Sequence, residues 1–145
     1  MKNLRLAFVL LISGVAIAKA GNPPDDHAFY LHALSDLRAA RWLIDHRPGN
    51  WQPTSNEINA IKEIDEAIKS IKGASIDDNK AIDDHPAVDE KTDRIDRLHE
   101  ADDFLKKAHE DIDQENDDSI ANLRNSSYEH IDAAIMAVKT AIYVN

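Results

Sequence analysis

The sequence predicts an all-α protein, a four-helix bundle built from two duplicated helical hairpins that an acidic linker joins. Apolar residues recur at steps of three and four in four segments, which is the spacing of one helix face. No segment alternates apolar and polar residues between turn signals, so no β-strand is expected. Similar sequence patterns also recur in the two halves of the chain, which indicates a repeated unit.

The first helix is expected to begin at residues 25–26, after two prolines, and to end before the Pro-Gly pair at 48–49. Arg41 interrupts its apolar face and is expected to pair with Asp65 or Asp132 of another helix. The residues expected to point inward are Tyr30, Leu34, Leu37 and Ile44.

The second helix has recognisable start and stop signals. Thr54 and Glu57 have the T-x-x-E spacing of a capping box, and Gly73 is expected to end the helix. Its apolar face is expected to consist of Ile58, Ile61, Ile64, Ile68 and Ile71.

The third and fourth helices follow an acidic linker. The third is expected over residues 93–115, and Asp117, Asp118 or Ser119 is expected to cap the start of the fourth. The inward residues expected in the third helix are Leu98, Ala101, Leu105, Ala108 and Ile112. Those of the fourth are Ile120, Leu123, Ile131, Ala134, Ile135, Val138 and Ile142.

An internal repeat relates the two halves of the chain. IDEAIKSIKGA in the second helix matches IDAAIMAVKTA in the fourth at an offset of 67 residues. LHALSDLRAARWLID in the first matches LHEADDFLKKAHEDID in the third at offsets of 67 and then 68. Duplication of a hairpin accounts for both matches, and each hairpin would cover the apolar face of the other.

Residues 1–20 have the three parts of a secretory signal peptide. Lys2 and Arg5 precede an apolar run from Leu6 to Ile17, and Ala18-Lys19-Ala20 has the small-x-small pattern of a cleavage site. Cleavage would leave residues 21–145 as a single domain, with no transmembrane anchor, in the periplasm or outside the cell.

The net charge of the chain restricts the classes of partner that it is expected to bind. The first 20 residues hold three of the 17 basic residues and none of the 27 acidic ones, so residues 21–145 have a net charge of −13. Such a surface repels nucleic acid and favours a cationic protein or peptide partner. The chain has no cysteine, so the fold must depend on its hydrophobic core.

The linker, residues 74–92, separates hairpin one, about 25–73, from hairpin two, about 93–144. A connection of this length in a compact domain is typically functional or flexible. Ile76, Ile82 and Val88 are expected to attach it to the bundle. An EF-hand calcium loop that started at Asp77 or Asp78 would lack the glycine at its sixth position and the glutamate at its twelfth.

Within the predicted helices, histidine and aspartate stand four residues apart in three places, so that both side chains would lie on one helix face. Imidazole and carboxylate ligands suit copper, zinc or nickel, although solvated surface pairs explain the same spacing. In an up-down bundle the first and third helices are diagonal, so we expect separate surface sites. The candidate metal ligands are His32, Asp36, His99, Asp103, His109 and Asp113, with His85 as a further candidate.

Sequence motifs that would indicate an enzyme are absent. The chain has no E-x-x-H motif of a di-iron bundle, no H-E-x-x-H, no G-x-S-x-G and no glycine-rich phosphate loop. We therefore expect a protein with no catalytic residues and no resident cofactor. The sequence makes no prediction of its oligomeric state.

HAFYLHALSDLRAARWLIDHRPG and DDHPAVD resemble a group of small exported bacterial helical-bundle proteins of uncharacterised function. This resemblance covers most of residues 21–145 and implies a secreted helical bundle. A looser similarity is to small periplasmic metal-binding helical proteins. Two hypotheses follow, a periplasmic interaction or stress-adaptor module that acts through its acidic surface, and a low-affinity buffer of divalent metal ions.

Overall fold

The computed structural model describes residues 27–47, 49, 51–74, 76–90, 93–115 and 118–144. The predicted signal peptide and the predicted start of the first helix at residues 25–26 lie outside this part of the chain. The all-α prediction is confirmed, because the described residues form helices and no strand. The elements are α1 (Ala28–Asp45), α2 (Ser55–Gly73), α3 (Arg94–Gln114), the 3₁₀ turn η1 (Asp118–Ile120) and α4 (Ala121–Tyr143).

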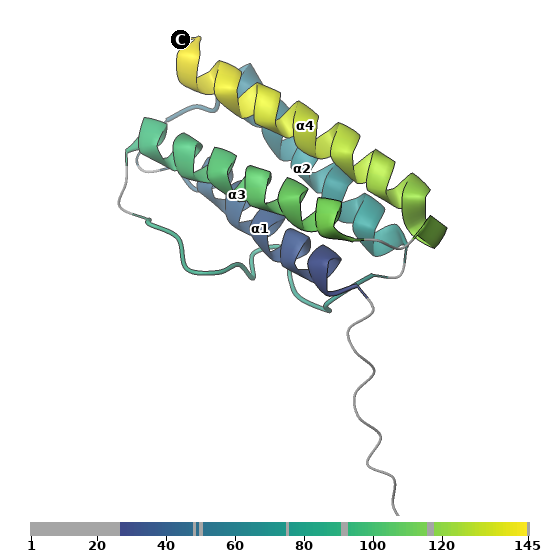
Figure 1. The fold of residues 1–145 in the computed structure, drawn as a ribbon. Helices are drawn as coiled ribbons and strands as arrows, with labels where there is room; N and C mark the ends of the chain where they lie inside the picture. The colour runs from purple at the N-terminus through teal and green to yellow at the C-terminus, as the bar shows by residue number, and fades with distance from the viewer. Residues whose placement is uncertain are drawn as a thin grey trace, which may run out of the picture.

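The four helices form a bundle in which α1 packs mainly on α3 and α2 mainly on α4 (Figure 1). The α1–α2 and α3–α4 contacts complete the ring, so α1 and α4 are diagonal, as are α2 and α3. The expectation that α1 and α3 are diagonal was therefore wrong. Helical periodicity defines the inward face of each helix, but it does not specify which helix becomes its neighbour.

Neighbouring helices run antiparallel. At one end of the α1–α3 pair, His27 Nδ1 lies 3.9 Å from Glu115 Oε2, and at the other end Arg97 donates to the carbonyl of His46. The segment after α2 must consequently travel the length of the bundle before α3 begins. We call residues 76–90 of this segment the crossover, and Figure 1 shows it passing along the outer side of α1. A single long connection of this kind is known in helical bundles.

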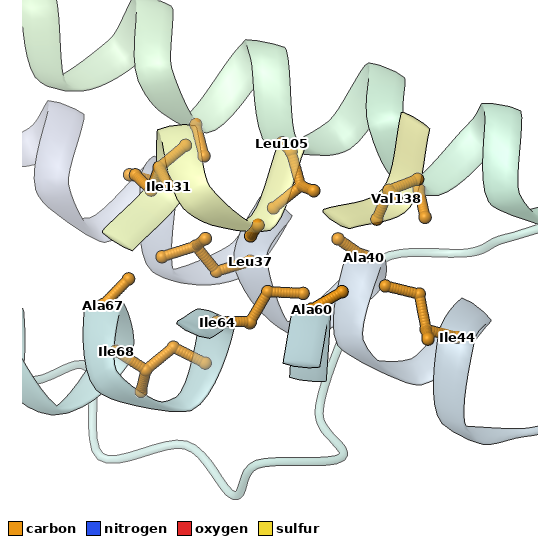
Figure 2. Close-up of a cluster of buried hydrophobic side chains, with 14 of the residues drawn as sticks. Leu37, Ala40, Ile44, Ala60, Ile64, Ala67, Ile68, Leu105, Ile131 and Val138 are labelled. Carbon is orange, nitrogen blue, oxygen red and sulfur yellow. The ribbon is translucent and has the colours of Figure 1, made fainter. Parts of the chain in front are cut away.

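The core is formed by apolar side chains from all four helices (Figure 2). The inward residues predicted for the first and third helices are buried, each with at most 1% of its surface exposed. One prediction for the second helix was wrong, because Ile58 is 55% exposed. Ile58 lies at the edge of the isoleucine pattern, in the first turn of α2.

The helix starts differ in how they are capped. Thr54 Oγ1 accepts from the Glu57 N–H at 3.2 Å and Glu57 Oε2 accepts from the Thr54 N–H at 2.6 Å, which confirms the capping box. Asp93 caps α3 through the N–H of Asp96. Two of the three caps predicted for the fourth helix, Asp118 and Ser119, belong to η1 instead, and the N-cap residue of α4 is Ile120, whose side chain makes no capping hydrogen bond. The third candidate, Asp117, lies outside the described residues.

Contacts between helices repeat with the offsets of the sequence. The predicted ion pair between Arg41 and Asp65 is present at 2.7 Å, and its counterpart in the second hairpin joins His109 to Asp132 at 3.5 Å. Glu63 and His130, which are 67 residues apart, contact each other at 2.8 Å between α2 and α4. Equivalent residues meet in this way at a twofold axis, so the packing agrees with a duplicated hairpin.

Candidate functional site

The first predicted metal pair lies at the outer seam between α1 and α3. His32 is exposed and Asp36 is half-buried, and both are within electrostatic reach of Asp111 on α3. Lys107, also on α3, lies on the same side. The seam therefore brings together an imidazole, two carboxylates and an ammonium group, a combination that sequence spacing did not reveal.

Both carboxylates of this seam have a pKa above the ordinary value for an aspartate. Burial raises the pKa of Asp36 to about 6, and repulsion from Asp111 adds to the rise, while Lys107 and His32 oppose it. Burial also raises the pKa of Asp111, against the attraction of His32. A cation placed between the two carboxylates would relieve their repulsion.

The second predicted pair has a different environment. His99 is exposed, and its ring meets the edge of Tyr143 on α4 at a centroid distance of 6.4 Å. Asp103 is 69% exposed and pairs with Lys106 of its own helix at 3.4 Å. His99 and Asp103 thus occupy positions equivalent to His32 and Asp36, but they contact an aromatic ring and a lysine respectively.

The third predicted pair flanks an aromatic ring. The His109 ring lies 4.6 Å from the Tyr128 ring, and Asp113 Oδ1 accepts from the Tyr128 hydroxyl at 2.9 Å. Burial and this hydrogen bond raise the pKa of Tyr128 to about 12. His109 also lines a groove of about 300 Å³ between α3 and α4, together with Asp132 and other side chains.

The three pairs remain separate from one another. Within the described ranges, no group of three or more His, Asp or Glu side chains is arranged to hold a metal ion. Sequence reasoning reached the same expectation of separate surface pairs, although it relied on the wrong helix arrangement. His85, the further candidate, packs against Trp42 instead.

A buried ion pair attaches the first part of the crossover to α1. Arg38, whose side chain is fully buried, donates two hydrogen bonds to Asp78, at 2.6 and 2.8 Å. Burial favours the neutral form of Asp78, but the bonds from Arg38 and from the Lys80 N–H outweigh it and lower the pKa of this carboxyl. Ile76 enters the core beside this pair.

An aromatic cluster attaches the last part of the crossover. The ring of His85 lies 4.8 Å from Trp42, on which His46 also stacks at 4.5 Å. The guanidinium of Arg97 lies 5.2 Å from the same indole and donates to the carbonyl of Glu90 at 3.2 Å. Both ends of the crossover are therefore bound to the bundle.

The middle of the crossover is exposed and acidic. Asp83 and Asp84 are exposed, and Ile82 beside them is 37% exposed, so the prediction that it attaches the linker was wrong. The carboxylates of Asp77 and Asp78 accept hydrogen bonds from the backbone N–H groups of Asn79 and Lys80. These bonds shape the preceding turn, where Asn79 has a φ of 57°. Asparagine tolerates this left-handed conformation better than most residues.

Sequence reasoning missed the residues that hold this segment. Arg38 and Arg97 fall beside the predicted apolar faces, and no contact was predicted for either. One signal was available, because Ala39 and Ala40 follow Arg38 and small residues on two sides of a helix allow a second segment to approach.

Comparison with protein families, curated proteins and solved structures finds no match to this chain. None of the helices in the described part of the chain is long and apolar enough to span a membrane.

Proposed function

We propose that this protein is a non-catalytic, exported interaction module that binds a cationic protein or peptide through its acidic surface. The observation that carries the proposal is the crossover. It is bound to the bundle at Asp78 and His85, yet it presents Asp83 and Asp84 to solvent between these two attachments.

An acidic segment that is already fixed to the bundle at both ends can bind a partner at a low cost in conformational entropy. A disordered segment loses conformational entropy when it binds, whereas a segment that is already ordered loses less. The net charge of −13 for residues 21–145 would attract a cationic partner and accelerate its encounter. Ile82 adds an exposed apolar side chain beside the carboxylates.

The proposal can be tested with a lysine octamer as the cationic probe. Binding to residues 21–145 should weaken steeply as salt increases, because surface charges are screened. The double variant Asp83→Asn/Asp84→Asn should weaken binding roughly fivefold at low salt. The measurement is fluorescence anisotropy of the labelled octamer at several salt concentrations.

The matched control is Glu110→Gln/Glu129→Gln, which removes the same charge from exposed positions on α3 and α4. Its binding should change less than that of the crossover variant. Equal losses in the two variants would show that net charge alone attracts the probe and would remove the crossover from the proposal. An absence of binding at low salt would contradict the proposal altogether.

A second candidate function is low-affinity capture of copper, zinc or nickel ions. The observation that favours it is the seam between α1 and α3. There the carboxylates of Asp36 and Asp111 repel each other, and both interact electrostatically with His32. Metal capture requires a neutral imidazole and ionised carboxylates, so it would weaken as the pH falls.

Calorimetric titration of metal-free residues 21–145 tests this candidate. His32→Ala should abolish binding, whereas His99→Ala, at the equivalent position of the other hairpin, should leave it unchanged. Binding that survives His32→Ala, or that is lost equally in both variants, would exclude the seam as the site.

A further inference from the structure

A groove of about 300 Å³ lies at the surface between α3 and α4, and its volume suits a small ligand. Its side chains come from one face of each helix, because spacings of three, four and seven residues return to the same side of a helix. The lining residues are Lys106, His109, Glu110, Asp132, Ile135 and Lys139.

The groove has an acidic end and a basic end. His109 Nε2 lies 3.5 Å from Asp132 Oδ1, so these two residues are at the same height in the antiparallel α3–α4 pair. Glu110 is next to His109, which places both carboxylates at this height. Lys106 lies three residues earlier in α3 and Lys139 seven residues later in α4, and in antiparallel helices both steps lead in the same direction. The two ammonium groups therefore share the other end.

These charged groups keep hydrogen-bonding capacity for a ligand. Lys139 and Glu110 are exposed, and within the described part of the chain neither side chain forms a hydrogen bond or an ion pair. Lys106 has three N–H donors and pairs with two carboxylates of its own helix, at 2.7 and 3.4 Å, so one donor remains. Ile135 is partly buried against the core and gives the groove an apolar wall.

The balance of charge indicates a zwitterionic ligand. The two lysines and the two carboxylates of the groove cancel, whereas residues 21–145 as a whole have a net charge of −13. A simple anion would be repelled by the protein as a whole, and a simple cation would meet the two lysines. A zwitterion has no net charge, so it avoids both penalties and can present one charge to each end of the groove.

The distance between the two ends indicates the length of the ligand. Seven residues separate Asp132 from Lys139, which is about 10 Å along a helix axis. A hydrogen bond of about 2.8 Å at each end leaves about 5 Å between the charges of the ligand. The ammonium and the carboxylate of a free amino acid are attached to one carbon, so they are too close together. A dipeptide adds one residue, which separates its charges by about 3.5 Å more.

We infer that this groove binds free dipeptides. The terminal ammonium of the dipeptide donates to Glu110 and Asp132 at the acidic end. Its terminal carboxylate accepts from Lys106 and Lys139, and an apolar side chain packs against Ile135. The groove is separate from the acidic crossover and from the seam between α1 and α3, so this binding is an activity beyond the functions proposed above.

The test is a titration of nitrogen-15-labelled residues 21–145 with glycyl-leucine, followed by proton–nitrogen correlation NMR. Saturable shifts should cluster at the amides of residues 106–110 and 132–139. N-acetyl-glycyl-leucine lacks the ammonium, glycyl-leucinamide lacks the carboxylate, and leucine has its charges too close together. Each of these three should bind at least about fivefold more weakly than the dipeptide.

Glycyl-leucinamide is the decisive comparison, because it is a cation that the acidic protein attracts in general. If it binds as tightly as glycyl-leucine, the lysines contribute nothing and the inference is overturned. Shifts that do not saturate, or that cluster outside the groove, would overturn it as well.

Variants test the two ends of the groove separately. Lys139→Gln and Glu110→Gln should each weaken the binding of glycyl-leucine about fivefold. The matched controls are Lys62→Gln on α2 and Glu129→Gln on α4, which remove the same charges from exposed positions that do not line the groove. The controls should bind as the unmodified chain does, and circular dichroism establishes that each variant is folded. Equal losses in a groove variant and its control would contradict the assignment of the site.

Discussion

The two hairpins have related sequences, but their first helices have different surroundings. At the offset of 68 residues, Arg38 of α1 corresponds to Lys106 of α3. Arg38 is fully buried and binds Asp78 of the crossover, whereas Lys106 is 47% exposed and pairs with Asp102 and Asp103 of its own helix. The difference shows that one connecting segment can convert a solvated helix face into an interior one.

The largest effect that tests this comparison is expected from Arg38→Ala. The variant would leave the carboxylate of Asp78 largely buried without its partner, which typically costs about 3–5 kcal/mol. The equivalent change Lys106→Ala should have a smaller effect, because Lys106 itself is 47% exposed and solvent screens its pair with the exposed Asp103, although its other partner, Asp102, is only 7% exposed. Urea unfolding followed by circular dichroism measures both. Similar losses in the two variants would mean that the crossover contact contributes little.

An intermediate effect is expected from Asp36→Asn. The pKa of Asp36 is raised to about 6 from an ordinary value of 3.8, so the folded state binds the proton more tightly than the unfolded state. The contribution of Asp36 to the free energy of unfolding is therefore largest below about pH 4, and it is lost as the pH rises through about 6. Asp36→Asn should stabilise the fold at pH 7 by about 1 kcal/mol, after allowance for solvent screening.

Thermal unfolding at pH 4 and pH 7 measures that gain, which should disappear at the lower pH. Asp103→Asn is the matched control in the second hairpin, because Asp103 is exposed and should give no such gain. A gain of equal size at both pH values would contradict the assignment of the effect to the ionisation of Asp36.

The smallest effect is expected for the repeated ion pair. Double-mutant cycles should give a coupling of about 0.5 kcal/mol for Arg41 with Asp65, because the pair is partly exposed. His109 with Asp132 should couple less than that, because their atoms are 3.5 Å apart and both side chains are more exposed. A coupling of His109 with Asp132 as large as that of Arg41 with Asp65 would contradict this order.

The sequence was sufficient to predict the helices, most of their inward residues and the capping box at Thr54, because periodicity and capping are local properties. The arrangement of the helices was not predictable in this way. The path of the crossover decides that α1 adjoins α3, and its anchors, such as the pair of Arg38 and Asp78, join residues 40 positions apart. The candidate site was predicted only as pairs within a helix, so the approach of Asp111 to Asp36 was missed.

The packing of α1 on α3 and of α2 on α4 has a consequence for the order of folding. Hairpin one cannot cover its apolar face until hairpin two has been synthesised, because each of its helices has its most extensive contacts with a later one. Contacts that join distant parts of a chain slow folding and delay the formation of a stable intermediate. The predicted signal peptide would require the chain to pass through a narrow secretion channel. A chain that stays unfolded until its last helix is available is suited to that passage.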